Sequence, residues 1–293
     1  MDELQDTIEG SKEDDSCSSS GDERKDEKGD DSDVEEEIKK ADLLTNKLKR
    51  VKVKYGPGHD KVISCALKLV HSLIPLYRLN DTEALLDEIM PFCKQKGGTV
   101  YIKAIQSRAF CLFKQYKFKE ALVLFHEQAQ LVGPSAALYE NMAHTFNSVG
   151  DYDSAATYFT QALQLLGQGS YGKKGGIYLG LGLVRERQGR PQEALPILQQ
   201  ALQHYKDDVG SDDGSSLIAK SHMSVGQCFE NLKQLPEAIN HIKEAVRIFK
   251  KTVGNSSPLT ANALGVLGRL YLTQVQTTNA FSGRRPCRSL ITC

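Results

Sequence analysis

One segment of the sequence carries the glycine and lysine spacing of a phosphate-binding loop. The run Gly167-Gln168-Gly169-Ser170-Tyr171-Gly172-Lys173-Lys174 matches a dinucleotide glycine pattern and most of a P-loop. Such glycines let backbone amides approach a phosphate at the start of a helix. Both motifs need a preceding strand, but a predicted helix precedes this run, and Lys174 replaces the hydroxyl that would hold magnesium. We interpret the run as a flexible basic loop, which leaves a nucleotide-dependent enzyme as a disfavoured alternative.

The histidines and cysteines show no spacing typical of a metal site or a catalytic centre. No histidine shares an adjacent turn with another histidine and a carboxylate at metal-ligand spacing. No serine or cysteine lies in a recognisable nucleophile elbow or beside a plausible base. We therefore expect no catalytic residue, no metal and no cofactor, and a protein that is not an enzyme. The residues considered are His59, His71, His126, His144, His204, His222 and His241, with Cys17, Cys65, Cys93, Cys111, Cys228, Cys287 and Cys293.

The cysteines and the absence of a long apolar run together predict the cellular compartment in which the protein acts. The seven cysteines are an odd number without close pairing, and several fall on predicted apolar helix faces, where cysteine behaves as a small hydrophobe. The sequence carries no signal peptide, transit peptide or apolar stretch long enough to span a membrane. We expect a reduced, cytoplasmic protein without a membrane partner.

The charge is divided between the two ends of the chain. Residues 1–40 hold 17 acidic against 6 basic residues, while the remainder holds 20 against 31, so the whole chain is neutral. The first 32 residues contain too few apolar side chains to offset their ordering entropy, and we predict that they are a disordered acidic segment. Ser20 and Ser32 each have a glutamate three residues on, a context that acidophilic kinases favour.

A basic run, Lys47 to Lys54, could serve nuclear import or nucleic-acid binding. Leu48 and Val51 within it keep helical spacing, so we interpret its lysines as the solvated face of a helix. They lie near the C-terminal end of that helix, where the helix dipole favours positive charge. We expect no nucleic-acid partner, since aromatic and basic residues do not interleave from repeat to repeat.

Helical periodicity positions these residues along most of the chain. Apolar residues recur every three or four positions, and glycine or proline interrupts the pattern at the predicted turns. We expect Pro191 and Pro236 to open helices, and Pro196 to kink one. The predicted helices span residues 33–55, 60–79, 81–95, 99–114, 118–131, 135–149, 152–166, 176–188, 191–207, 215–232, 236–252 and 258–273.

Two phrases of small and bulky residues recur with a period of roughly 34 to 44 residues, which indicates a solenoid. Small residues suit points where antiparallel helices cross closely, and we expect Gly182 to face Ala194 and Gly226 to face Ala238. The first phrase reads Met142, Ala143, Phe146; Leu181, Gly182, Arg185; and Val225, Gly226, Phe229. The second reads Ala155, Phe159, Ala162; Ala194, Leu198, Ala201; and Ala238, Ile242, Ala245.

The pattern stops after Val275, so the helix expected to pair with residues 258–273 is missing. This leaves an apolar face uncovered, and our hypothesis is a truncated or alternatively terminated product. We assign residues 33–275 to the solenoid and residues 276–293 to an irregular tail.

The repeats resemble the tetratricopeptide repeat family over about residues 60–273. One repeat occupies nearly every signature position, with Tyr139, Met142, Ala143, Phe146, Gly150, Tyr152, Ala155, Phe159 and Ala162. The later repeats are longer, and the linker Val253 to Ala261 is similar to those of kinesin light chain and nephrocystin-like repeats. Arg185 and Gln128 depart from the pattern. The resemblance implies an all-α, right-handed superhelical solenoid of antiparallel hairpins, with about five repeats and flanking single helices.

In that family the first helix of each hairpin lines a concave groove that holds a peptide or a helix. The resemblance therefore implies an adaptor or scaffold whose partner is another protein, and the cations favour an acidic or mixed segment. The acidic residues 1–32 could fold back over this groove. The alternative is a structural subunit that packs into a larger assembly through its C-terminal apolar end. The predicted groove residues are Lys103, Gln106, Phe110, Lys114, Glu140, His144, Asn147, Leu179, Leu183, Arg187, Lys220, Met223, Gln227, Asn231, Asn262 and Arg269.

Overall fold

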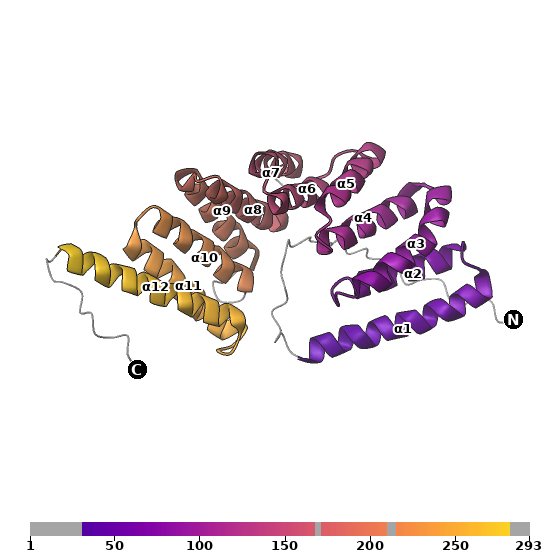
Figure 1. The fold of residues 1–293 in the computed structure, drawn as a ribbon, viewed down its shortest axis with the longest axis horizontal. Coiled ribbons are helices and arrows are strands. Elements are labelled where there is room, and N and C mark those ends of the chain that lie inside the picture. Colours follow the sequence, from indigo (N-terminus) through magenta and orange to yellow (C-terminus); the bar gives the residue numbers. More distant parts are fainter. Residues whose placement is uncertain (1–30, 168–170, 210–214, 282–293) are drawn as a thin grey trace.

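The chain folds into a succession of α-helices that follow an arch, with the first and last helices as its two arms (Figure 1). The computed structural model describes residues 31–167, 171–209 and 215–281, and these hold twelve helices and no strand. The predicted all-α solenoid is confirmed. The helices are α1 (Asp31–Tyr55), α2 (Asp60–Leu73), α3 (Leu79–Lys96), α4 (Gly98–Lys114), α5 (Phe118–Val132), α6 (Ala136–Val149), α7 (Tyr152–Leu166), α8 (Tyr171–Arg187), α9 (Pro191–Val209), α10 (Ser216–Asn231), α11 (Leu235–Thr252) and α12 (Pro258–Phe281).

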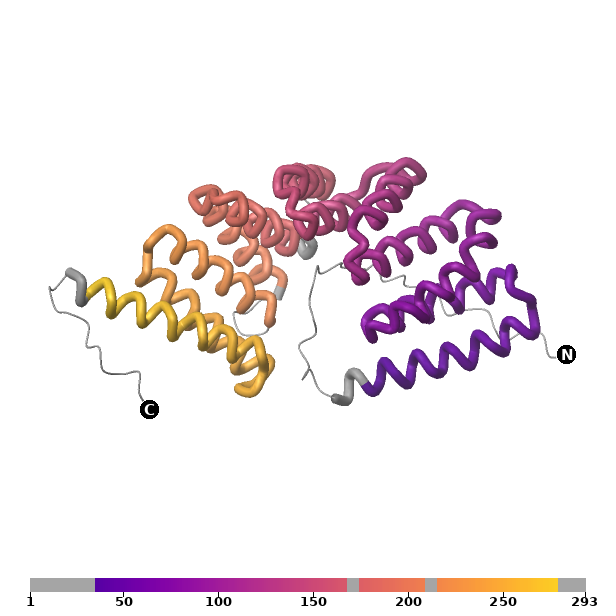
Figure 2. The backbone as a smooth tube through the Cα atoms, viewed as in Figure 1, coloured from indigo at the N-terminus to yellow at the C-terminus, as the bar shows by residue number. Residues whose placement is uncertain are grey.

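Each helix packs chiefly against its neighbours in the chain, as the tube in Figure 2 makes easy to follow. The most extensive contacts join α8 with α9, α10 with α11, and α6 with α7, the hairpins that carry the recurring phrases. At the N-terminal arm α2 packs more on α1 than on α3. Because contacts are local, the array behaves as a one-dimensional stack in which each hairpin needs its neighbours to bury its apolar faces.

Turns between helices use the local chemistry that the sequence provides. Gly150 ends α6 with a left-handed φ of 91°, a conformation that glycine adopts without a steric penalty. The Asp151 side chain then accepts a hydrogen bond of 3.1 Å from the Ser154 amide and caps α7. Such a cap satisfies an amide that has no partner within its own helix. A turn this short sets α7 antiparallel to α6.

Glycines at two helix crossings leave no room for a side chain. A Cβ added at Gly226 would lie 2.7 Å from Ile242 Cδ1 and 3.3 Å from the backbone oxygen of Ala238. At Gly182 the added Cβ would lie 2.5 Å from Leu198 Cδ2. The predicted close approach of Gly226 to Ala238 is therefore confirmed, whereas Gly182 faces Leu198, four residues beyond Ala194.

The apolar core is divided along the arch. One cluster of buried residues lies between residues 41 and 111, a small one between 109 and 142, and two more between 143 and 270. Helix α5 buries only Ala121 and Phe125 in the small cluster. Contact between α5 and α6 is the least extensive of any consecutive pair, so the N-terminal helices join the rest through a narrow core.

Several predictions about helix boundaries were wrong. Helix α2 ends at Leu73 rather than at residue 79, because Pro75 lacks the backbone N–H that would continue the helix, and Leu79 instead begins α3. Helix α8 begins at Tyr171, five residues before the predicted start, since no proline prevents this stretch from becoming helical. Helix α12 continues to Phe281, beyond its predicted end at 273 and the predicted end of the solenoid at 275, because a helix can continue on a solvated surface without apolar periodicity. Helix α1 begins two residues early, at Asp31.

Helix α9 is one continuous element through Pro196. The predictions for the acidic residues before 31 and the tail after 281 lie outside the described residues. Among the helices that the structure describes, none has the length and apolar character needed to cross a bilayer.

Candidate peptide-binding groove

The even-numbered helices form the inner face of the arch. Helix α2 contacts α4, α6 contacts α8, and α8 contacts α10, whereas no two odd-numbered helices pack to a similar extent within the described ranges. A stack curves toward the side on which successive elements lie closer together, which places the even-numbered helices inside the curve. We call this side the inner face.

All sixteen predicted groove residues lie on even-numbered helices, namely α4, α6, α8, α10 and α12. Lys103, Arg187, Asn231, Asn262 and Arg269 are exposed, whereas most of the others are half-buried. Met223 is only 9% exposed and packs in the core cluster of α9 to α12. Phe110 packs against the N-terminal cluster. Both side chains support the stack; Met223 offers little surface to a ligand, whereas the half-buried Phe110 keeps part of its surface accessible.

A chain of polar contacts joins the ends of the inner helices. Arg187 of α8 donates a hydrogen bond of 2.7 Å to Asn147 Oδ1 of α6. Asn231 of α10 donates one of 2.8 Å to Glu186 Oε1 of α8. Arg269 of α12 pairs with Glu230 of α10, with Nη2 3.0 Å from Oε2. We call these contacts the polar ladder; they bring together Asn147, Arg187, Asn231 and Arg269 as parts of one structure.

The ladder includes two carboxylates that the sequence analysis missed. Glu186 and Glu230 each lie directly before a predicted groove residue, in the last turn of an inner helix. That recurrence was the available signal. Burial raises the pKa of Glu186, opposed by its hydrogen bond with Asn231. Because Glu230 neutralises Arg269, the inner face is less cationic than the sequence indicated.

His144 contributes no positive charge to the inner face at neutral pH. Burial lowers the pKa of its imidazole to about 4, and its ring packs edge-on against Phe159 with centroids 5.0 Å apart. Its Nε2 lies 4.0 Å from Glu140 Oε1, a separation that would be an ion pair only with a protonated ring. We therefore regard this contact as one between a neutral ring and a carboxylate.

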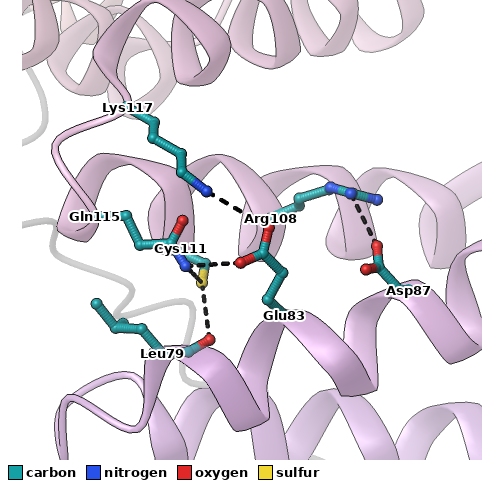
Figure 3. A network of polar contacts seen from close by, with 7 residues as sticks. All are labelled: Leu79, Glu83, Asp87, Arg108, Cys111, Gln115 and Lys117. Atoms are coloured by element: carbon teal, nitrogen blue, oxygen red, sulfur yellow. Dashed lines mark hydrogen bonds and ion pairs between the residues drawn. The ribbon is translucent and has the colours of Figure 1, made fainter.

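At α4 the predicted groove cation Lys114 has an aromatic neighbour, and side chains that were not predicted, Arg108 and Gln115, have acidic ones. Lys114 Nζ lies 5.8 Å from the centroid of the Tyr77 ring, a cation–π geometry. Figure 3 shows the adjoining network: Glu83 of α3 accepts a hydrogen bond of 2.9 Å from Gln115 Nε2, and Arg108 lies 2.8 Å from Asp87. These contacts fasten α4 to α3.

Cys111 in this network is not suited to nucleophilic chemistry. Its Sγ lies 3.7 Å from the Leu79 carbonyl oxygen, to which it donates (Figure 3). Burial, with a contribution from Glu83, raises the pKa of its thiol to about 11. A thiol rather than a thiolate is therefore present at neutral pH, and only a thiolate is an effective nucleophile.

Two surface hollows of about 460 Å³ each flank α7 on the outer side of the stack. The first is lined by α5, α6 and α7, including Tyr139, Tyr158 and Asp153, and the second by α7 and the end of α8, including Arg185 and Gln188. Neither contains a predicted groove residue. Nowhere in the described ranges do three histidine, cysteine, aspartate or glutamate side chains gather as a metal site would require.

The segment with the phosphate-loop spacing follows a helix, as predicted. Helix α7 ends at Leu166, and the next residue, Gly167, has a φ of 58°. Tyr171, Gly172, Lys173 and Lys174 then belong to α8 rather than to a loop. The strand that the dinucleotide-binding motif and the P-loop both require before their glycines is therefore not present in this described part of the chain.

Residues 134–207 and 217–281 match the sequence family described as tetratricopeptide repeat. These ranges cover α6 to α9 and α10 to α12, where the recurring phrases are most regular. No curated protein sequence matches the chain.

Several solved structures share the fold at low sequence identity. The apo form of RapI aligns with a TM-score of 0.63 at 15% identity, covering 84% of this chain and 73% of that one. A Rap protein complexed with Competence and Sporulation Factor aligns with a TM-score of 0.57 at 18% identity, covering 85% and 74%.

A chain of the APC/C hetero-tetramer Cut9–Hcn1 aligns with a TM-score of 0.59 at 15% identity. The alignment covers 81% of this chain but 41% of that one, so the present chain spans less than half of its length. At these identities the likeness concerns the arrangement of helices.

Proposed function

Because the chain is a member of the tetratricopeptide repeat superfamily, matched over residues 134–207 and 217–281, we propose that it is a non-enzymatic adaptor that captures a segment of another protein on its inner face. The observation that carries this proposal is the closer packing of the even-numbered helices, which curves the stack around that face. A curved stack of helices presents an extended concave surface, which suits an extended peptide or a helix.

The exposed charges favour an acidic or mixed segment as the ligand. Lys103 on α4 and Arg187 on α8 are exposed cations on the inner face, and the half-buried Leu183, one turn before Arg187 on α8, adds apolar surface. Surface charges of this kind raise association rates and are screened by salt. We expect the affinity to fall as the salt concentration rises.

The solved structures with this fold give the proposal a precedent without identifying the partner. A Rap protein is complexed with Competence and Sporulation Factor, and Cut9–Hcn1 is a hetero-tetramer. Cys65, Cys93, Cys111 and Cys228 are buried free thiols, which supports action in a reducing compartment such as the cytoplasm.

The test measures binding of an arrayed library of acidic and mixed peptides, followed by fluorescence anisotropy on the best binders. We expect the double variant Lys103→Glu/Arg187→Glu to lose at least tenfold in affinity. The control Lys119→Glu/Lys250→Glu makes a similar charge change at exposed positions on the odd-numbered helices α5 and α11. Equal affinity of both double variants would contradict recognition on the inner face.

The same assay tests whether the acidic N-terminal residues compete with ligands. A tethered segment has a high effective concentration, so weak contacts suffice for competition. We expect deletion of residues 1–30 to raise the affinity for acidic peptides at low salt. Unchanged affinity would remove this part of the proposal.

A second candidate function is a structural subunit of a larger assembly. Leu264, Tyr271, Leu272 and Val275 are exposed apolar side chains on α12, each at least 40% accessible. Exposed apolar surface of this kind marks interaction sites in soluble proteins.

A further inference from the structure

Helix α12 exposes an apolar stripe along one face. Leu264 is 41% exposed, Leu272 66% and Val275 56%, and Tyr271 lies on the same side at 40%. The small residues Ala261, Gly265 and Gly268 are exposed between them. Positions three and four apart share a face of a helix, so residues 261, 264, 265, 268, 271, 272 and 275 form one continuous surface. We call it the α12 stripe.

The stripe has the chemistry of a helix crossing whose second helix is absent among the described residues. Leu267, Gly268 and Tyr271 repeat the phrase of Val225, Gly226 and Phe229 on α10. A Cβ at Gly226 would collide with Ile242 of the paired helix α11, but one at Gly268 or Gly265 would meet no atom within 4 Å. The positions that permit close approach are present, and within the described residues nothing approaches them.

The stripe is apolar, whereas a face of a repeat array that meets only water, as in a capping repeat, is usually polar. Arg269 is the one charged residue of α12, and it already pairs with Glu230 of α10. Lys243 of α11 lies beside the stripe, with its Nζ 5.6 Å from the centroid of the Tyr271 ring, and its charge is directed at that ring. Because α12 itself adds no charge to the stripe, electrostatic repulsion between two copies is limited to this cation. This favours a second copy of the chain as the occupant.

The order of small and bulky residues is self-complementary about Gly268. We propose that α12 pairs antiparallel with α12 of a second copy, around a two-fold axis at Gly268. In that register position 268 + n of one copy faces position 268 − n of the other. Val275 then faces Ala261, and Tyr271 faces Gly265, so a bulky side chain meets a small one, as Ile242 meets Gly226 within the chain. Leu272 faces Leu264, which is a contact between two bulky apolar side chains.

The size of the stripe sets the expected strength. The stripe runs from residue 261 to residue 275 of α12 and is therefore about 22 Å long at 1.5 Å per residue. Its width of about 10 Å then gives roughly 220 Å² per copy, about a quarter of what stable complexes bury on each side. The dimer is therefore concentration-dependent, and the isologous contact closes at two copies.

The test is sedimentation velocity of the full 293-residue chain over a wide concentration range. We expect the wild type to pass from monomer to dimer between about 1 and 100 µM, the low-affinity range for a contact of this area. Gly268→Leu puts a bulky residue on the axis in both copies and should weaken the dimer at least tenfold. The monomer tolerates this change because the space around Gly268 is open. Leu272→Glu should do the same, whereas the control Val123→Glu, at a residue equally exposed on α5, should have no effect.

Crosslinking then tests the register. With Cys17, Cys287 and Cys293 changed to serine, a Leu264→Cys variant mixed with a Leu272→Cys variant should form an intermolecular disulfide more readily than either variant alone. A chain that stays monomeric at 100 µM would overturn the proposal, as would a dimer indifferent to Gly268→Leu. Saturable binding of a synthetic peptide of residues 235–252, the sequence of α11, in place of dimerisation would also overturn it. The inner-face variant Lys103→Glu/Arg187→Glu should dimerise normally, so the two proposals fail separately.

Discussion

At the residue scale, the clearest consequence concerns the protonation of His144. Burial lowers its pKa to about 4 in the folded protein, whereas an exposed histidine titrates near 6.5. As the pH falls from about 6.5 toward 4, the unfolded chain binds a proton that the folded chain excludes, so the stability contributed by the neutral ring is lost. NMR titration should find this ring neutral at pH 5, with its signal assigned by its loss in His144→Gln. A midpoint near 6.5 would contradict the buried environment.

Glycines of similar sequence context should respond in opposite ways to substitution. Gly226→Ala places a methyl group 2.7 Å from Ile242 Cδ1, and overpacking of this kind costs about 1–3 kcal/mol. Gly265→Ala enters open space, so the better helix propensity of alanine should stabilise the protein by up to about 1 kcal/mol. Urea denaturation of both variants measures the difference. A similar loss of stability in the two would show that Gly265 is also enclosed.

The sequence predicted the crossing residues but not their polar neighbours. Gly226 and Ala238 could be assigned because close helix packing needs small residues at fixed offsets, and these offsets can be read directly from the sequence. The contact of Arg187 with Asn147 joins side chains 40 positions apart. It depends on the rotamers of two long side chains and on the superhelix that brings α6 to α8, neither of which a local pattern encodes.

At the element scale, the polar ladder limits how much charge the inner helices present. Glu230→Gln would leave Arg269 without its carboxylate partner and should raise the affinity of the inner face for acidic peptides by a factor of a few. The stability should change by less than about 1 kcal/mol, because this ion pair is partly exposed. Fluorescence anisotropy and thermal unfolding measure the two effects.

The control is Glu244→Gln on α11, which removes one carboxylate from the pair with Arg247 on the same helix. It changes the net charge equally and leaves the ladder intact. If both variants raise peptide affinity to the same extent, the effect comes from net charge alone and Arg269 has no part in recognition.

Helix ends were harder to predict than helix identities. All twelve helices could be recognised from apolar spacing, but α12 extends through Gln276, Thr277 and Thr278, where the apolar pattern has ended. Propagating a helix adds a backbone hydrogen bond for each residue fixed and needs no apolar contact. A periodicity argument finds the packed part of a helix and stops where packing stops.

At the scale of the whole molecule, the divided core makes the arch uneven in stability. Helix α5 links the N-terminal cluster to the later repeats through two buried residues, and α4 makes no extensive contact with α6 among the described residues. In a stack with nearest-neighbour coupling, one weak interface separates regions that can open independently. The sequence hinted at this where Gln128 replaces a small residue of the repeat, but the extent of the division depends on packing across three helices.

Paired core substitutions should therefore have local effects. Leu86 on α3 and Leu198 on α9 are both almost fully buried, in separate clusters, and truncation of such a leucine to alanine costs about 2–5 kcal/mol. In hydrogen exchange measured by mass spectrometry, Leu86→Ala should lower protection in α1 to α4 while α8 to α11 keep theirs. Leu198→Ala should do the reverse. If either substitution lowered protection equally along the whole arch, the narrow core at α5 would have to couple the two sides strongly. The molecule would then unfold as one cooperative unit rather than as a stack with a weak interface between α5 and α6.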